Sequence, residues 1–126
     1  MSWITDVLLL AGTEEIWGIE DDEGNEIEPE TNPFEEINRW LQSQGVAVGL
    51  VDLSHHAFRA GNKAMQALVY GGAFNFLDED GFLKVVRQQR WLSPHNVQLL
   101  MKSEMEERFT MYEINREEAV SDPVEE

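Results

Sequence analysis

Hydrophobic residues recur at helical spacing in two segments, and the first of these is residues 33–44. Phe34 and Ile37 lie three positions apart in this segment and are followed by further apolar residues at the same period. Asn32 is a typical N-cap in front of Pro33, and Gly45 provides a stop signal. The pattern therefore predicts a helix over 33–44.

The second helical pattern begins at Asp78 and places Phe82 and Val86 on one face. Aspartate is a favourable N-cap, and an apolar residue in front of it can pack against the first turn. Ser93 and Pro94 are expected to end this helix.

Short apolar or alternating runs predict the strands. Gly71 and Gly72 are expected to end one run as a bulge or as a point of close approach by another backbone or a ligand, with 73–76 as its continuation. The runs cover 2–10, 46–53, 64–70, 97–102 and 108–115.

The last third of the chain allows two interpretations. Val97, Met101 and Met105 fit a helical period, whereas Thr110 and Tyr112 alternate with polar residues as in a half-buried strand. We favour a hairpin over 97–115, because proline and asparagine precede it in the manner of a strand entry.

The resulting order is β-α-β-β-α-β-β, which predicts an α+β fold with a mostly antiparallel sheet and two helices on one face, a ferredoxin-like variant. Residues 1–115 form the expected single domain, with an acidic loop over 13–31 that is mobile or a loose hairpin.

Residues 116–126 form an expected acidic, disordered tail. The other sheet face needs cover, which the acidic loop or a second copy could supply.

Charge is distributed unevenly along the 126 residues, whose net charge is −16. Residues 1–36 contain twelve acidic and no basic residues, 37–102 are net positive, and 103–126 are again acidic. This balance argues against nucleic acid or an anionic membrane as partner. The chain has no cysteine, no apolar run long enough to span a bilayer and no targeting signal, so a cytoplasmic protein is expected.

Catalytic and metal-binding motifs do not emerge from the sequence. The adjacent His55 and His56 point to opposite sides of an extended chain, and neighbouring Asp52 and Ser54 are too close in sequence to complete a triad with them. Both EF-hand registers, centred on Gly24 and Gly81, fail at their first ligand position. We therefore expect no catalytic residue, no metal and no cofactor, and a non-enzymatic role is favoured.

The acidic loop offers the strongest candidate for binding. Apolar residues inside it, Trp17 among them, either pin the loop onto the core or provide an aromatic anchor for a partner. Small acidic bacterial immunity proteins are similar in size and charge, although no motif carries this class analogy. The first hypothesis is thus a protein-binding or inhibitory module for a basic protein partner. Its expected contact residues are Trp17, Glu20, Asp21, Asp22, Glu23 and Glu26.

Two alternatives remain open at this stage. One is a small-ligand site or enzyme in the 55–75 region, where glycines and amides accompany basic and aromatic side chains. The other is a dimeric accessory protein that uses the uncovered sheet face, so both a monomer and a homodimer are compatible with the sequence. The residues of the alternative pocket are His55, His56, Asn62, Lys63 and Tyr70.

Overall fold

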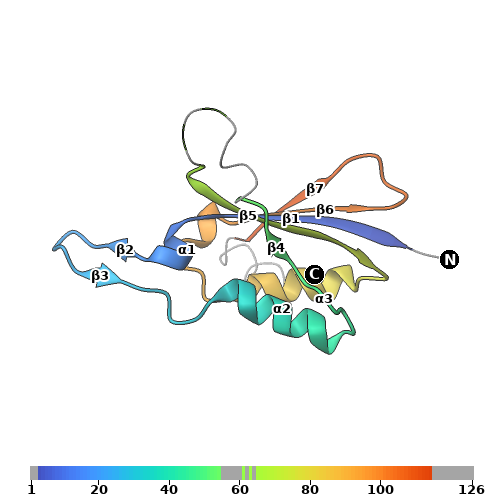
Figure 1. The fold of residues 1–126 in the computed structure, drawn as a ribbon, viewed down its shortest axis with the longest axis horizontal. Helices are drawn as coiled ribbons and strands as arrows, with labels where there is room; N and C mark the ends of the chain where they lie inside the picture. The colour runs from blue at the N-terminus through green and yellow to red at the C-terminus, as the bar shows by residue number, and fades with distance from the viewer. Residues whose placement is uncertain (1–2, 55–60, 62, 64, 115–126) are drawn as a thin grey trace, which may run out of the picture.

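A five-stranded antiparallel sheet organises the chain (Figure 1). We describe the structure from a computed structural model, which covers residues 3–54, 61, 63 and 65–114. The strand order is β4-β5-β1-β6-β7. The strands are β1 (Ile4–Gly12), β4 (Val51–Asp52), β5 (Ala67–Asn75), β6 (Gln98–Ser103) and β7 (Thr110–Glu113).

Strand β1 lies at the centre of this sheet and pairs with β5 on one side and β6 on the other. Its odd-numbered residues, such as Val7 and Leu9, are buried, and its even-numbered residues are only half-buried. This alternation follows from the period of two along a strand and identifies one face of the sheet as the core face.

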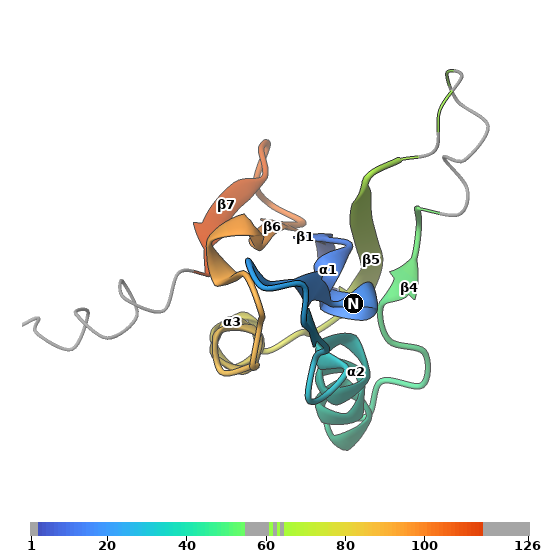
Figure 2. The same cartoon turned by 90° about the vertical axis from the view of Figure 1, so that its left-hand side faces the viewer.

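Two helices, α2 (Pro33–Ser43) and α3 (Glu79–Arg87), lie side by side along this core face (Figures 1 and 2). Helix α2 starts where the sequence predicts, because the Asn32 side chain accepts hydrogen bonds from the amides of Phe34 (3.0 Å) and Glu35 (3.3 Å). Fully buried Ile37, Leu41 and Phe82 join Val7 and Leu9 in one apolar core. A short helix α1 (Glu14–Trp17) and a 3-10 turn η1 (Pro94–Asn96) complete the helical elements of the described residues.

Helix α3 is shorter than expected. The Asp78 side chain caps its first turn by accepting from the Gly81 amide (3.0 Å), but the helix ends at Arg87 rather than at Ser93. Trp91 explains the early end, since its ring turns back into the core and its indole N–H donates to the Val86 carbonyl (2.8 Å). Core packing of one large aromatic therefore replaces a further helical turn.

The first turn of α3 is also fastened to the sheet. The Glu79 carboxylate accepts hydrogen bonds from the hydroxyls of Thr5 and Ser103, each at 2.6 Å. Thr5 and Ser103 are cross-strand partners on β1 and β6, so one carboxylate joins two strands to one helix.

The strand expected over 46–53 is wrong in extent, because only Val51–Asp52 pairs. Asn38 of α2 explains the difference. Its side-chain amide accepts from the Leu50 N–H (2.8 Å) and donates to the Leu50 carbonyl (3.0 Å). The helix thus satisfies backbone groups that a strand partner would otherwise bond.

The glycine pair within β5 does not end the strand or form a bulge. Gly71 pairs with Leu8 and Gly72 with Val7 in an unbroken register. A Cβ atom at Gly72 would lie 2.8 Å from the Phe74 ring, and one at Gly71 would lie 2.8 Å from a Leu53 methyl. The glycines make room for neighbouring side chains, and a Cβ at Gly71 would also lie 3.0 Å from the Val7 carbonyl oxygen, so the expected close approach by another backbone is found there.

The class prediction of an α+β fold with a mostly antiparallel sheet is confirmed, and so is the C-terminal hairpin, formed by β6 and β7. The acidic segment is more ordered than a loop, since it contains α1 and a small hairpin of β2 (Ile19–Glu20) and β3 (Glu26–Ile27). The expected tail, 116–126, lies outside the described residues. Within the described ranges, no helix has the length and apolarity needed to cross a membrane.

Candidate functional site

The β2–β3 hairpin projects from one end of the sheet (Figure 1). Ile19 pairs with Ile27 and Glu20 pairs with Glu26, so an apolar pair and a like-charged pair alternate along it. Directly opposed residues of an antiparallel pair project to the same side. The hairpin therefore carries an aliphatic pair on one side and a pair of carboxylates on the other.

The tip of the hairpin is closed by Asp21. Its Oδ1 accepts from the backbone N–H groups of Glu23 (2.9 Å) and Asn25 (2.8 Å), and Gly24 takes a positive φ of 87°. These hydrogen bonds, that from Asn25 foremost, lower the pKa of the Asp21 carboxyl. Asp21 is thus a turn-forming residue, in contrast to the other acidic residues predicted for this site.

Helix α1 fixes the base of the hairpin to the body through Glu15. This side chain is fully buried, and its two oxygens accept from the amides of Leu92 and Ser93, both at 2.9 Å. Neighbouring Glu14 accepts from the Asn96 side chain (3.1 Å). Its pKa is lowered, chiefly by a backbone hydrogen bond within the residue and further by the Asn96 bond.

Gly18 links α1 to the hairpin at φ 84°. A Cβ atom at this position would lie 2.5 Å from the Ile27 carbonyl oxygen, so only glycine fits both the backbone angle and the space. Glycine at this position therefore allows the chain to pass from α1 into the hairpin.

Apolar side chains of the acidic segment face outward. Trp17 is 77% exposed, and Ile19 and Ile27 are 39% and 40% exposed. The interpretation that these residues pin the segment onto the core is therefore wrong for the three of them, and only Ile16 packs against the core. Three exposed large apolar side chains within one short segment are typical of a contact surface.

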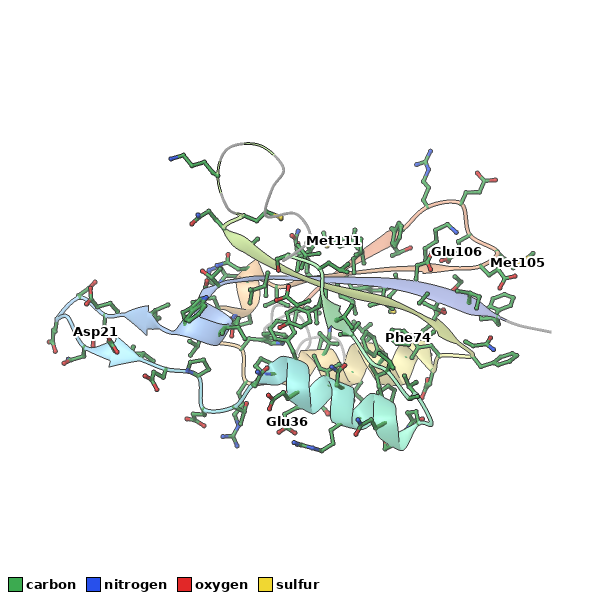
Figure 3. All side chains as sticks on the ribbon, in the orientation of Figure 1. Asp21, Glu36, Phe74, Met105, Glu106 and Met111 are labelled. Atoms are coloured by element: carbon green, nitrogen blue, oxygen red, sulfur yellow. The ribbon has the colours of Figure 1, made fainter. Side chains whose placement is uncertain are left out.

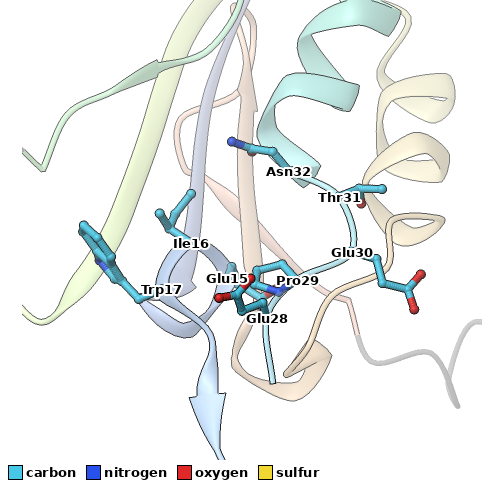
Figure 4. A pocket seen from close by; sticks show the side chains of 8 residues that line it. All are labelled: Glu15, Ile16, Trp17, Glu28, Pro29, Glu30, Thr31 and Asn32. Carbon is cyan, nitrogen blue, oxygen red and sulfur yellow. The ribbon is translucent and has the colours of Figure 1, made fainter. Parts of the chain in front are cut away.

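A pocket of about 440 Å³ lies between α1 and the segment that leads into α2 (Figure 4). Figure 4 shows Trp17 at one end, Glu28 and Pro29 near the middle and Glu30 turned outward at the other end. Glu30 forms an exposed ion pair with Arg90 at 2.6 Å. The lining residues are Glu15, Ile16, Trp17, Glu28, Pro29, Glu30, Thr31 and Asn32.

The carboxylates of the hairpin are available to a partner. Glu20, Asp22, Glu23 and Glu26 are exposed, and among the described residues no lysine or arginine forms an ion pair with any of them. The opposed Glu20 and Glu26 repel one another in the isolated chain. A cation bound between them would relieve that repulsion.

Residues of the alternative pocket are only partly placed. The Tyr70 ring stacks on Phe34 with centroids 3.9 Å apart and planes 7° apart. Burial, followed by the charges of Asp52 and Glu35, raises the pKa of its phenol. Lys63 is exposed, whereas His55, His56 and Asn62 lie outside the described residues. In the part of the chain that is described, no group of three or more acidic or histidine residues could hold a metal ion.

The sequence predicted Trp17 and the hairpin carboxylates as contact residues, and the structure places them in α1 and the β2–β3 hairpin; the sequence did not predict the pocket wall at 28–32 or the structural role of Glu15. Nothing in the sequence distinguishes Glu15 from its exposed acidic neighbours, because its partners lie more than seventy residues away. The Pro29 to Asn32 stretch carries a turn signal that could have indicated a wall leading into α2. No protein-family model, curated protein or solved structure matches the chain.

Proposed function

We propose that this chain is an acidic binding module, whose α1–hairpin surface docks onto a basic protein partner. The observation that carries the proposal is an exposed Trp17 at the end of α1, where the chain enters a hairpin whose carboxylates form no ion pair within the described chain. Binding surfaces place an aromatic anchor next to groups of complementary charge. Such docking would inhibit the partner, by analogy with the small acidic immunity proteins of similar size and charge.

In this proposal the hairpin carboxylates and Trp17 contribute to binding at different distances. The carboxylates of Glu20, Asp22, Glu23 and Glu26 attract a basic partner at long range and accelerate its association. Trp17 supplies apolar contact area at short range. The adjoining pocket suits a lysine or arginine side chain, because Ile16 and Pro29 provide apolar walls for its stem and Glu28 a carboxylate for its charge.

The first experiment is affinity capture from a cell lysate at low and high ionic strength, with the whole chain as bait. Raising the salt from about 0.1 M to about 1 M shortens the screening length from ~10 Å to ~3 Å, so a partner held by charge is released. Proteins retained only at low salt and rich in lysine and arginine are then purified for kinetic measurements.

A fourfold amide variant tests the role of the hairpin in those measurements. E20Q/D22N/E23Q/E26Q leaves the turn-forming Asp21 in place, and we expect association to slow by roughly 10- to 100-fold. The matched control neutralises four exposed carboxylates elsewhere and should slow association far less. Its substitutions are E35Q, D80N, E107Q and E113Q.

Equal association rates for the fourfold variant and the wild type would contradict the proposal. So would an equal slowing by both fourfold variants, since that result would show an effect of net charge without a local surface.

We also infer that the domain is a ferredoxin-like variant with one added strand, β7. The order β4-β5-β1-β6 supports this inference, because sequential strands one to four then stand in the order 2-3-1-4 across an antiparallel sheet. The absence of cysteine supports a cytoplasmic location. Both inferences are compatible with a binding module, and neither identifies the partner.

A further inference from the structure

The sheet face opposite α2 and α3 carries an apolar row that crosses all five strands. The pairing registers place Val51, Gly71, Leu8, Leu100 and Met111 side by side. Val51 is 46% exposed and Met111 44% exposed, and Leu8 and Leu100 are half-buried. Figure 3 shows Met111 on the side of the sheet away from the helices, whereas Phe74 points toward them.

Further apolar side chains widen this open face. Leu10 and Val69 are cross-strand partners one step along the same face, and both are half-buried. Leu53 follows β4, and its methyl lies where a side chain at Gly71 would stand. A continuous apolar surface of this kind on a small domain indicates an interaction site.

Two opposite charges flank the apolar row on the same face. Asp6 and Lys102 are cross-strand partners on β1 and β6, one step from Leu8 and Leu100. Both are half-buried, and no ion pair joins them or ties either to another described residue. A surface with adjacent acidic and basic groups can complement itself, which a two-fold interface requires.

The chain's own C-terminal residues are a poor alternative cover. Residues 115–126 contain five acidic side chains and only one alanine and two valines as apolar residues. Such a composition offers little apolar area to a face of five strands.

We propose that this open face is covered by a second copy of the chain, in a two-fold dimer. A two-fold axis parallel to the strands and between β1 and β6 places Leu8 opposite Leu100 of the second copy. The same axis places Asp6 opposite Lys102 of the second copy, and symmetry makes each contact twice. Face-to-face sheets pack with their strands nearly aligned, as this arrangement needs.

The size of the face sets the expected strength of the dimer. Five strands at ~4.8 Å spacing and about five residues at ~3.4 Å give a footprint of roughly 400 Å². This is below the ~800 Å² per partner of a standard interface, so we expect a dimer that dissociates in the micromolar range. The hairpin of the proposed binding site projects from the end of the sheet, so it stays free in this dimer (Figure 1).

Sedimentation velocity over a concentration series tests the proposal. We expect a shift with concentration from 14.5 kDa to twice that mass. Met111→Glu should raise the dissociation constant at least 10-fold, because it places a charge in the apolar row. Met105→Glu is the matched control, since Met105 is 75% exposed at the β6–β7 connection, away from the strands of the sheet (Figure 3), and should leave association unchanged.

Charge exchange provides a second test that does not depend on the apolar row. Asp6→Lys and Lys102→Asp should each weaken self-association, because each creates two like-charged contacts across the axis. An equimolar mixture of the two variants should associate at least as well as wild type, since every contact then joins opposite charges. A monomer at all concentrations, a dimer indifferent to Met111→Glu, or a mixture no better than the single variants would overturn the proposal.

The dimer and the proposed binding function fail independently. The fourfold hairpin variant should still dimerise, and Met111→Glu should still bind a basic partner through its hairpin. A loss of dimerisation in the hairpin variant would contradict the placement of the interface on the open face.

Discussion

Two neighbouring acidic regions of this chain use their carboxylates in opposite ways. In helix α1, both oxygens of Glu15 accept from backbone amides at 2.9 Å, and Glu14 accepts from Asn96. In the hairpin a few residues later, Glu20 and Glu26 face one another on the surface, and no ion pair within the described chain involves either. The two regions have similar composition and differ in the donors that surround them.

The difference shows what determines the role of a carboxylate in an acidic protein. Where donors are fixed by the fold, a carboxylate becomes part of the structure, as Glu15 and Glu79 do. Where no donors surround them, neighbouring carboxylates repel one another and destabilise the isolated chain. A bound cation would remove that repulsion. Substituting a carboxylate that is hydrogen-bonded within the fold should therefore lower the free energy of unfolding. Substituting an exposed carboxylate of the hairpin should instead slow association with a partner.

The largest expected effect on stability is that of Glu15→Ala. The substitution removes two charge-assisted hydrogen bonds and leaves the amides of Leu92 and Ser93 without an acceptor, so we expect a loss of about 3 kcal/mol. Urea denaturation measures the free energy of unfolding. Glu20→Ala is the control and should change it by less than about 0.5 kcal/mol. Equal losses for both variants would remove the distinction between the two regions.

Trp17→Ala should come next in size, but in affinity rather than stability. Truncating an aromatic anchor at a binding surface costs about 2 kcal/mol, or roughly a 30-fold rise in Kd for the captured partner. The free energy of unfolding should stay within about 0.5 kcal/mol, because the ring is 77% exposed. Met105→Ala, another exposed apolar truncation, is the control for both measurements. An unchanged Kd would exclude Trp17 from the contact surface.

A smaller effect is expected in the acid range from Glu14. Because its pKa is lower in the folded chain than the usual 4.5, its stabilising contribution is complete above that pH. It is lost as the pH falls through the folded pKa. The difference in unfolding free energy between wild type and Glu14→Gln should therefore be constant at neutral pH and shrink in acid. A difference that stays constant or grows in acid would contradict the assignment.

The smallest effect concerns the like-charged pair. Glu20→Gln together with Glu26→Gln should stabilise the hairpin by about 0.2–0.5 kcal/mol, since two repelling charges are removed. Hydrogen exchange of the Asn25 amide, which donates to Asp21 within the turn, measures this local stability. The gain should fall as salt is added, because salt screens the repulsion in wild type. Faster exchange in the double variant would show that these charges support the hairpin.

Local signals in the sequence predicted the fold where they acted within a few residues. Asn32 and Asp78 cap the two helices as expected, since a cap needs only its own first turn. Errors arose where distant contacts decided the outcome. Trp91 turns into the core and ends α3 early. The Asn38 side chain makes the hydrogen bonds with the Leu50 backbone that a neighbouring strand would otherwise make.

The candidate site divides in the same way. The density of acidic residues and the presence of Trp17 among them indicated the hairpin surface, because both are properties of the local sequence. The internal use of Asp21 was missed, since an aspartate that forms a turn looks like any other in a run of acids. The role of Glu15 depends on how α1 meets residues more than seventy positions away, which no local pattern encodes, and the turn signal at 29–32 indicates a turn without indicating that α1 lies opposite it.

The central position of β1 has a consequence for how the protein is made. Gly12 pairs with Ala67, Ile4 pairs with Asn75, and the other edge of β1 pairs with Gln98 to Ser103. Strand β1 is synthesised before the other strands of this sheet, yet it is among the last to be fully paired, because its neighbours follow more than fifty residues later. Until then its two backbone edges are exposed, and a nascent strand with Leu8, Leu9 and Leu10 in sequence is a target for chaperones and for aggregation.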